Sequence, residues 1–292
     1  MGKRLVLFFI TNMAIVITLS IVMSLLGVGR YITPDGRLDL VSLGIFCFVW
    51  GMGGALISLQ ISRWSAKRLM NVQLVDGHTG NQDLDWLHTT VGHLTRQANL
   101  PMPEVGVYDS PEVNAFATGP SKRRSLVAVS TGLLRNMTRD EVQGVLAHEV
   151  SHIGNGDMVT MTLLQGVVNA FVLFLARLAG FAVRQAVDSR YANMAAFAVT
   201  LVLEIALGVL GLLVVSAFSR SREFRADAGA SALAGRGAMI SALRRLQATA
   251  ERVDTSQPAL ASFKIAGSRG FLQLFSTHPP LEERLAALER AA

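Results

Sequence analysis

The sequence has little charge and almost no cysteine. Only 16% of its 292 residues are charged and 51% are hydrophobic, whereas soluble domains average about 25% charged residues. The single cysteine, Cys47, excludes an intramolecular disulfide and any metal site built from several cysteines. Tyr and Trp number three each, and no nucleic-acid-reading motif accompanies the excess of six basic charges. This composition argues against an ordinary soluble enzyme, a disordered chain and a nucleic-acid-binding protein.

Four long apolar blocks account for the missing charge. They comprise residues 5–26, 40–61, 158–183 and 194–218. The first two contain no charged side chain, and the other two carry only Arg177 and Glu204. Because about 20 helical residues cross the hydrocarbon core of a bilayer, we expect four transmembrane helices.

The first block resembles a signal peptide in one respect, since Lys3 and Arg4 precede it. Its apolar run is longer than the usual stretch of about 7–15 residues, and no small-residue cleavage site follows it. We therefore interpret this block as a retained membrane anchor.

The basic residues that flank the blocks predict their orientation, because Lys and Arg in short flanks favour the cytoplasmic side. Eight of them fall on one side: Lys3, Arg4, Arg63, Lys67, Arg68, Arg220, Arg222 and Arg225. Four fall on the other: Arg30, Arg37, Arg184 and Arg190. We expect both termini and the long segment 62–157 to be cytoplasmic.

The two charges inside the apolar blocks are expected to meet. A charge inside a span is costly unless it is paired or reaches water. If the third and fourth blocks fold as a hairpin about Ser189, Arg177 lies about one helical turn from Glu204. The sequence favours an Arg177–Glu204 salt bridge. The alternative is that each side chain separately reaches the membrane surface or a polar cavity.

The remaining residues predict a mixed α/β domain that the second hairpin interrupts. Expected elements are helices over 81–98, 138–153, 220–252 and after Pro280, and strands over 104–108, 114–118 and 126–130. A break near Gly235 and Gly237 is expected within 220–252. The expected fold is a membrane protein, mainly α with a small β-sheet. Its expected parts are a transmembrane hairpin (1–61), a cytoplasmic part (62–157), a second transmembrane hairpin (158–218) and a second cytoplasmic part (219–292).

The helix over residues 138–153 carries the most informative pattern, HEVSH at residues 148–152. His148 and His152 are four residues apart, so they project from one helical face and can bind one Zn²⁺. Glu149 can then take a proton from the water that zinc activates. The alternative is a buried structural histidine pair or a chance match.

A catalytic zinc site needs a third protein ligand and an open position. Downstream candidates are Asp157, Glu223, Asp227 and His278. Asp157 follows the expected end of the helix, so we expect it to point along the helix axis rather than into the site. An extended motif with glycine at 155 and histidine at 158 is excluded, because Asn155 and Met158 stand there.

Glu223 and Asp227 are four residues apart and share a helical face. One carboxylate could bind zinc while the other hydrogen-bonds a ligating imidazole; the alternative is a solvated face that pairs with Arg222 and Arg225. The third and fourth blocks separate His152 from Glu223. Two membrane crossings return Glu223 to the side of the histidines, whereas one crossing would prevent a shared site.

Several segments together resemble the HtpX family of bacterial heat-shock membrane proteases, which are zinc endopeptidases related to the eukaryotic CAAX-prenyl protease. The segments are NAFATG (114–119), HEVSH (148–152) with NGDMVT (155–160), SREFRAD (221–227) and STHPP (276–280). The resemblance covers nearly the whole chain, including the four-span layout, and shows no departure at the motif positions.

The resemblance implies a gluzincin-type zinc metalloprotease domain that faces the cytoplasm from the bacterial inner membrane, with one Zn²⁺ per chain. It makes His148, His152 and Glu223 the zinc ligands, Glu149 the general base and Asp227 the support of a ligating histidine. It also implies a role in quality control, in which the protein acts together with other membrane proteases to cut unfolded or misfolded membrane proteins. No nucleic-acid partner is expected.

Two further sites are expected near the cleft. The segment Asn114, Ala115, Phe116 and Ala117 matches the family's strand beside the cleft, where a substrate can add as an extended strand. The alternative for Phe116 is a place in the core of an interior strand. His278, which two prolines follow, could donate a hydrogen bond to the oxyanion of the tetrahedral intermediate.

The sequence favours zinc-dependent hydrolysis of peptide bonds over two alternatives. An intramembrane protease is disfavoured because polar segments at 138–143 and 155–157 place the motif at or outside the membrane surface. A non-enzymatic membrane scaffold or transporter with a structural zinc site is disfavoured by Glu149, since a structural site needs no general base.

Overall fold

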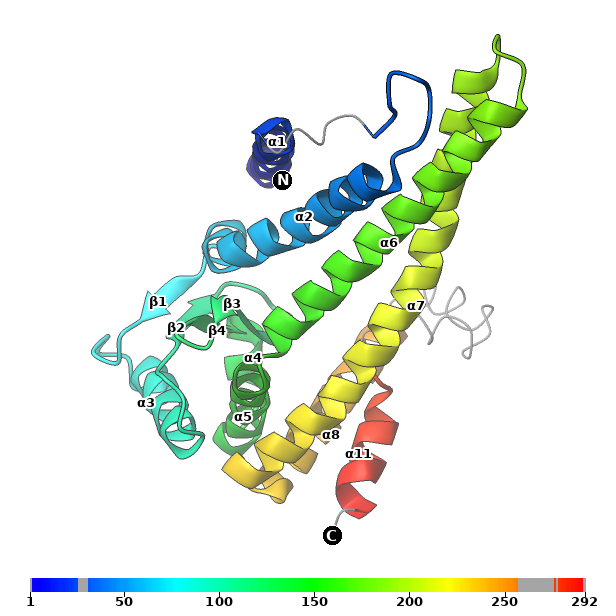
Figure 1. Ribbon diagram of the computed structural model, residues 1–292. Helices are drawn as coiled ribbons and strands as arrows, with labels where there is room; N and C mark the ends of the chain where they lie inside the picture. The colour runs from blue at the N-terminus through cyan, green and yellow to red at the C-terminus, as the bar shows by residue number, and fades with distance from the viewer. Residues whose placement is uncertain (1, 26–30, 257–275, 277, 291–292) are drawn as a thin grey trace. The chain divides into compact units, whose positions relative to one another are not determined.

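The computed structural model describes residues 2–25, 31–256, 276 and 278–290. The chain divides into two compact units (Figure 1). One unit comprises Met1–Ser58 with Met161–Val215, and the other comprises Leu59–Thr160 with Ser216–Ala292. We call them the membrane unit and the site unit.

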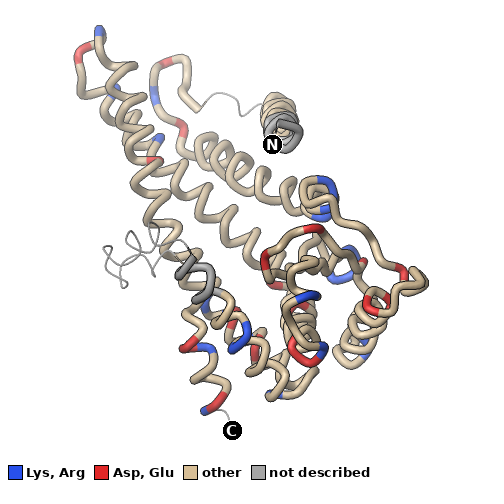
Figure 2. The backbone as a smooth tube through the Cα atoms, turned by 180° about the vertical axis from the view of Figure 1, so that it is seen from behind, with Lys and Arg blue, Asp and Glu red and all other residues tan. Residues whose placement is uncertain are grey.

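The membrane unit is built from apolar helices. Over the described residues three helices are long and apolar enough to cross a membrane: α2 (Leu40–Leu69), α6 (Asp157–Ala186) and α7 (Ala192–Ala234). Their apolar stretches are nearly free of charge in Figure 2, and fewer than a quarter of the residues there are buried. A sequence this apolar that stays exposed is suited to lipid rather than water.

Helix α1 (Gly2–Leu25) covers most of the first apolar block. Its stretch Met13–Leu25 is apolar but shorter than a span, and Leu26 lies outside the described residues. The structure therefore supports three spans directly, and the fourth stays a prediction.

Helices α6 and α7 run side by side in the membrane unit (Figure 1). Gly180 and Gly211 allow this approach, because a Cβ at Gly180 would clash with Thr200 and one at Gly211 would lie 2.5 Å from Val168. The hairpin brings Arg177 Nη1 within 2.6 Å of Glu204 Oε1. The predicted ion pair between the two apolar blocks is confirmed.

The site unit contains a four-stranded sheet in the order β1-β2-β4-β3. The strands are β1 (Gln73–Val75), β2 (Glu104–Tyr108), β3 (Ala115–Ser121) and β4 (Arg124–Ser130). β2 and β4 are parallel, whereas β1 and β3 pair antiparallel to them. The three expected strands are present, and the three-residue β1 is an addition. β3 forms one edge of this sheet.

Helices complete the site unit and enclose its core. They are α3 (Gln82–Gln97), α4 (Thr131–Asn136), α5 (Arg139–Asn155), α8 (Arg236–Ser256) and α11 (Leu281–Arg290), with the ends of α2, α6 and α7. Leu94, Val127, Leu146 and Leu243 are fully buried in one cluster that joins α3, the sheet, α5 and α8. The expected break between two helices falls at Gly235, whose φ of 88° ends α7.

Candidate metal centre

Helix α5 presents both histidines of the HEVSH pattern. Thr138 and Glu141 form a capping box: the Thr138 side chain accepts from Glu141 N, and Thr138 N donates to Glu141 Oε2 at 2.8 Å. Gly156, with a φ of 70°, ends the helix one turn after His152. The sequence thus fixes both ends of α5, which holds His148 and His152 in the buried centre of the unit.

Helix α7 supplies the carboxylates that face α5. Glu223 and Asp227 are almost completely buried. The two helices approach closely where Gly229 meets Ser151, since a Cβ at Gly229 would lie only 2.7 Å from Ser151 Oγ. Because Ser151 precedes His152 directly, this contact positions Glu223 against the imidazoles.

Three ligand-type groups converge between α5 and α7. Nε2 of His148 and Nε2 of His152 are 3.0 Å apart. Glu223 Oε2 lies 3.4 Å from the first of these nitrogens, and Glu223 Oε1 lies 3.4 Å from the second. The structure therefore brings together the three residues that the sequence proposes as metal ligands.

Each imidazole also has a carboxylate on its other nitrogen. Asp227 Oδ1 lies 2.9 Å from Nδ1 of His148, the contact that the sequence anticipates for Asp227. Asp157 Oδ2 lies 2.6 Å from Nδ1 of His152. With Nδ1 donating in this way, Nε2 of each ring carries the lone pair that a metal needs.

The prediction that Asp157 points away from the site is wrong. Gly156 turns the backbone into its left-handed conformation, and α6 begins at Asp157 in a new direction. The Asp157 side chain, 1% exposed, therefore folds back onto His152 instead of continuing along the axis of α5.

Arg284 is a member of this site that sequence reasoning did not identify. It comes from α11, is 6% exposed, and donates through Nε and Nη2 to the two oxygens of Asp227 at 2.7 and 2.5 Å. Its Nη1 lies 3.6 Å from Glu223 Oε2. The only sequence signal is its place six residues after His278, which is too general to single it out.

Of the remaining predicted residues, Glu149, His278, Asn114 and Ala115 line one cavity of about 150 Å³, whereas Phe116 and Ala117 pack against the core clusters. Its lining includes His148, Glu149, Glu223, His278, Arg284 and, from the strand side, Asn114 and Ala115. Nδ1 of His278 is 2.9 Å from Glu223 Oε2, although the His278 side chain is 61% exposed. Phe116 packs against Tyr108 with ring centroids 5.7 Å apart, so its half-buried side chain contacts the small cluster of Tyr108, Leu126 and Ala128 instead of this cavity.

The carboxylates set the protonation of the imidazoles. Burial of the ring would lower the pKa of His152, but hydrogen bonds from the ring to Asp157 and Glu223 outweigh it and raise that pKa to about 9. The pKa of His148 is likewise raised, because hydrogen bonds to Asp227 and Glu223 overcome burial. The site thus favours positive charge between its carboxylates.

The donor set fits a zinc ion. Bonds of about 2.0–2.1 Å in a tetrahedron separate neighbouring ligand atoms by roughly 3.3–3.4 Å, and the three separations here are 3.0, 3.4 and 3.4 Å. Among the described residues, Oε1 of Glu223 is buried without a hydrogen-bond partner, and Arg222 Nη2 lies 3.6 Å from it; a metal ion would supply the direct bond that this buried oxygen lacks. His148, His152 and Glu223 therefore fit a single zinc ion per chain.

A zinc ion beside the Glu149 carboxylate is the arrangement by which metallopeptidases cleave amide bonds. Together with the apolar helices of the same chain, it defines a membrane-bound metallopeptidase. Residues 81–292 match the family described as "Peptidase family M48". The chain belongs to this family.

The similar proteins extend over the full chain. A "Protease HtpX homolog" of Thiobacillus denitrificans is 51% identical over 290 residues, which cover 98% of each chain. A "Protease HtpX" of Cellvibrio japonicus is 48% identical over 293 residues, which cover 99% of each. The crystal structure of Ste24p from S. mikatae has the same fold, with a TM-score of 0.67 and 19% identity over 99% of this chain and 67% of that one.

Proposed function

We propose that this membrane-bound protease is a zinc-dependent endopeptidase that hydrolyses peptide bonds of unfolded or misfolded membrane proteins. The observation that carries the proposal is the convergence of both Nε2 atoms on a buried carboxylate whose Oε1 has no hydrogen-bond partner among the described residues. His148, His152 and Glu223 are the proposed ligands. Zinc held there supplies Lewis acidity, which activates water and polarises the scissile carbonyl.

Glu149 is the proposed general base. It follows His148 on α5, lies at the wall of the cavity and is partly accessible. Its carboxylate takes the proton of the attacking water and then delivers it to the leaving amine. His278 reaches the same cavity through its contact with Glu223, and we propose that its ring donates to the oxyanion of the tetrahedral intermediate.

Asp157, Asp227 and Arg284 are proposed to position the ligands. Asp227 and Asp157 orient the two rings through Nδ1. Arg284 in turn holds both oxygens of Asp227, which keeps this buried carboxylate paired.

The proposed substrate site is the edge strand β3 and the residue before it. Asn114 and Ala115 line the cavity with Glu149, and β3 pairs with β4 along only one edge. A substrate segment can therefore pair with residues 114–117 as an added extended strand, through backbone hydrogen bonds. Phe116 contributes its backbone, because its half-buried ring packs against Tyr108.

We further propose the cellular setting from the flanking charges. The basic excess supports a cytoplasmic location of both termini and the active site, and the similarity to HtpX proteins supports a bacterial inner membrane. On this proposal residues 1–61 and 158–218 are two transmembrane hairpins, while 62–157 and 219–292 together form the protease domain. Quality control, alongside other membrane proteases, is the role that suits a protease in this place.

Metal removal tests the zinc dependence. The purified protein should lose peptide cleavage with a chelator and regain it with added zinc, at one zinc per chain. His152→Ala should lose bound zinc, whereas His93→Ala should keep it, since His93 is exposed on α3. Full cleavage by the metal-free protein would contradict the proposal.

A further inference from the structure

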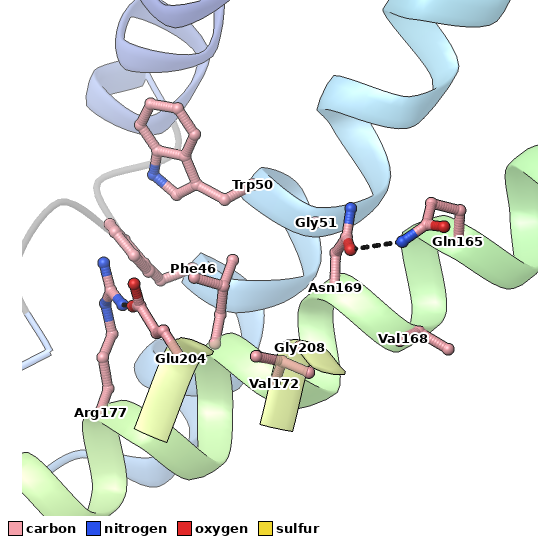
Figure 3. Close-up of a pocket in the computed structure, with 11 residues that line it drawn as sticks. Phe46, Trp50, Gly51, Gln165, Val168, Asn169, Val172, Arg177, Glu204 and Gly208 are labelled. Atoms are coloured by element: carbon pink, nitrogen blue, oxygen red, sulfur yellow. Dashed lines mark hydrogen bonds and ion pairs between the residues drawn. The ribbon is translucent and has the colours of Figure 1, made fainter. Parts of the chain in front are cut away.

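The membrane unit contains a cavity of about 500 Å³, within the range of ligand-binding pockets. Residues of α2, α6 and α7 line it (Figure 3). Its wall is unusual for a membrane helix bundle because it carries two amides, an indole and an ion pair. These polar groups are Trp50, Gln165, Asn169, Arg177 and Glu204.

Helix α6 contributes a polar stripe to this cavity. Gln165 and Asn169 are four residues apart and share one face of the helix, and Arg177, two further turns along, lines the same cavity. Gln165 Nε2 donates to Asn169 Oδ1 at 2.8 Å. That bond leaves the Gln165 carbonyl oxygen and the Asn169 amide nitrogen available as an acceptor and a donor.

Trp50 adds an unsatisfied donor from α2. Its Nε1 is one of three buried side-chain atoms without a hydrogen-bond partner in the described part of the chain. The indole of Trp50 lines the cavity beside Phe46. Because its Nε1 is enclosed, the indole meets the cavity through its ring, and the amides of Gln165 and Asn169 are the polar groups open to an occupant.

The cavity wall has no net charge. Arg177 and Glu204 neutralise each other at 2.6 Å, and the guanidinium also lies 5.3 Å from the centre of the Phe46 ring. The groups that remain offer both donors and acceptors. This chemistry matches an uncharged amide better than the charged headgroup of a phospholipid.

We propose that this cavity binds uncharged polar groups of a substrate's transmembrane segment, namely backbone amides of an interrupted helix or an Asn or Gln side chain. A peptide that unwinds in the bilayer must find partners for its N–H and C=O groups, and the cavity supplies them. The inference rests on the proposed function, since it makes the cavity a selector of defective membrane-protein substrates.

Two reporter substrates test the selection. Both carry the same water-soluble cleavage segment behind one transmembrane helix, which is uninterrupted in one and contains a central Asn-Pro-Gly in the other. The full-length protein, reconstituted in bilayers, should cleave the interrupted substrate with a kcat/KM about threefold to twentyfold higher, the range of hydrogen-bond effects within membranes.

Variants of the polar stripe localise the effect. Gln165→Leu/Asn169→Leu should reduce the preference to about one. Val167→Leu is the matched control, because Val167 is exposed on the same helix and does not line the cavity. Cleavage of a soluble unfolded peptide by each variant reports on the catalytic centre alone.

Cross-linking provides a second measurement that does not depend on cleavage. In a Glu149→Gln/Cys47→Ala background, Asn169→Cys should form a disulfide with a cysteine at the interruption more readily than Val167→Cys does. Equal cross-linking of both positions would contradict the proposal.

Other outcomes also decide the matter. An unchanged preference in the Gln165→Leu/Asn169→Leu variant, or no preference in the unaltered protein, would overturn the proposal. Loss of soluble-peptide cleavage in that variant would also overturn the proposal. The two amides would then be needed for the fold or the catalytic centre, and not for the selection of substrates. Failure of the unaltered protein to cleave even the soluble peptide would instead contradict the endopeptidase function itself.

Discussion

Asp157 Oδ2 lies 2.6 Å from Nδ1 of His152, across the glycine that ends α5. The His152 imidazole on α5 is thereby bonded to the first residue of α6. A carboxylate in this position fixes the orientation and tautomer of the ring and raises its basicity toward a metal.

Asp157→Asn should therefore weaken zinc binding by about 10- to 100-fold, because the amide keeps the shape but not the charge. Competition with a chromophoric chelator measures the zinc affinity directly. Asp140→Asn is the control, since Asp140 is exposed in the first turn of α5. Equal affinities for the two variants would show that Asp157 does not act on the metal site.

Arg284→Met should destabilise the folded protein. It leaves the Asp227 carboxylate buried without its bidentate partner, and breaking a buried pair from one side costs about 3–5 kcal/mol. Thermal unfolding of the zinc-loaded protein in detergent is the measurement. Arg290→Met, an exposed change on α11, should have little effect, and similar unfolding temperatures for both variants would refute this assignment.

The ion pair within the membrane unit should show coupling. Arg177→Leu leaves Glu204 unpaired, so this variant should be less stable than Arg177→Leu/Glu204→Leu, in which both charges are gone. A double-mutant cycle on unfolding should give a coupling energy of about 0.5–3 kcal/mol. A coupling energy of zero would mean that the two side chains act independently.

Zinc affinity should rise with pH. The folded pKa of His152, about 9, exceeds its ordinary value of 6.5. Protonation therefore stabilises the zinc-free protein fully below about pH 6.5, and this contribution is lost as the pH rises through 9. Because zinc needs the neutral ring, its affinity should increase about tenfold per pH unit for each displaced proton. Titrations between pH 6.5 and 8.5 that show no slope would contradict this.

Local signals made much of the fold predictable. The Thr138–Glu141 box and Gly156 mark the ends of α5, and Gly235 marks the break between α7 and α8. The strand β1 could not be predicted, because three residues that pair only with β2 carry no readable alternation. A short edge strand depends on the partner it finds rather than on its own sequence.

The site divides in the same way. Helical spacing pairs His148 with His152 and Glu223 with Asp227, since residues four apart share a face, whereas the choice of Glu223 as the ligand rests on the resemblance to the HtpX family. Asp157 and Arg284 depend instead on how α6 and α11 leave the preceding turns, which spacing along one helix does not determine. Their buried contacts are visible only once the chain is folded.

The most direct test of the central claim compares the unaltered protein with Glu149→Gln. Glu149 lines the cavity but is not among the three clustered ligand groups, so the variant should keep one zinc per chain and the same fold. Its kcat for an unfolded membrane-protein substrate should fall by about 10²- to 10⁴-fold, the contribution of general acid–base catalysis. Undiminished cleavage by the zinc-loaded variant would contradict the mechanism proposed for this site.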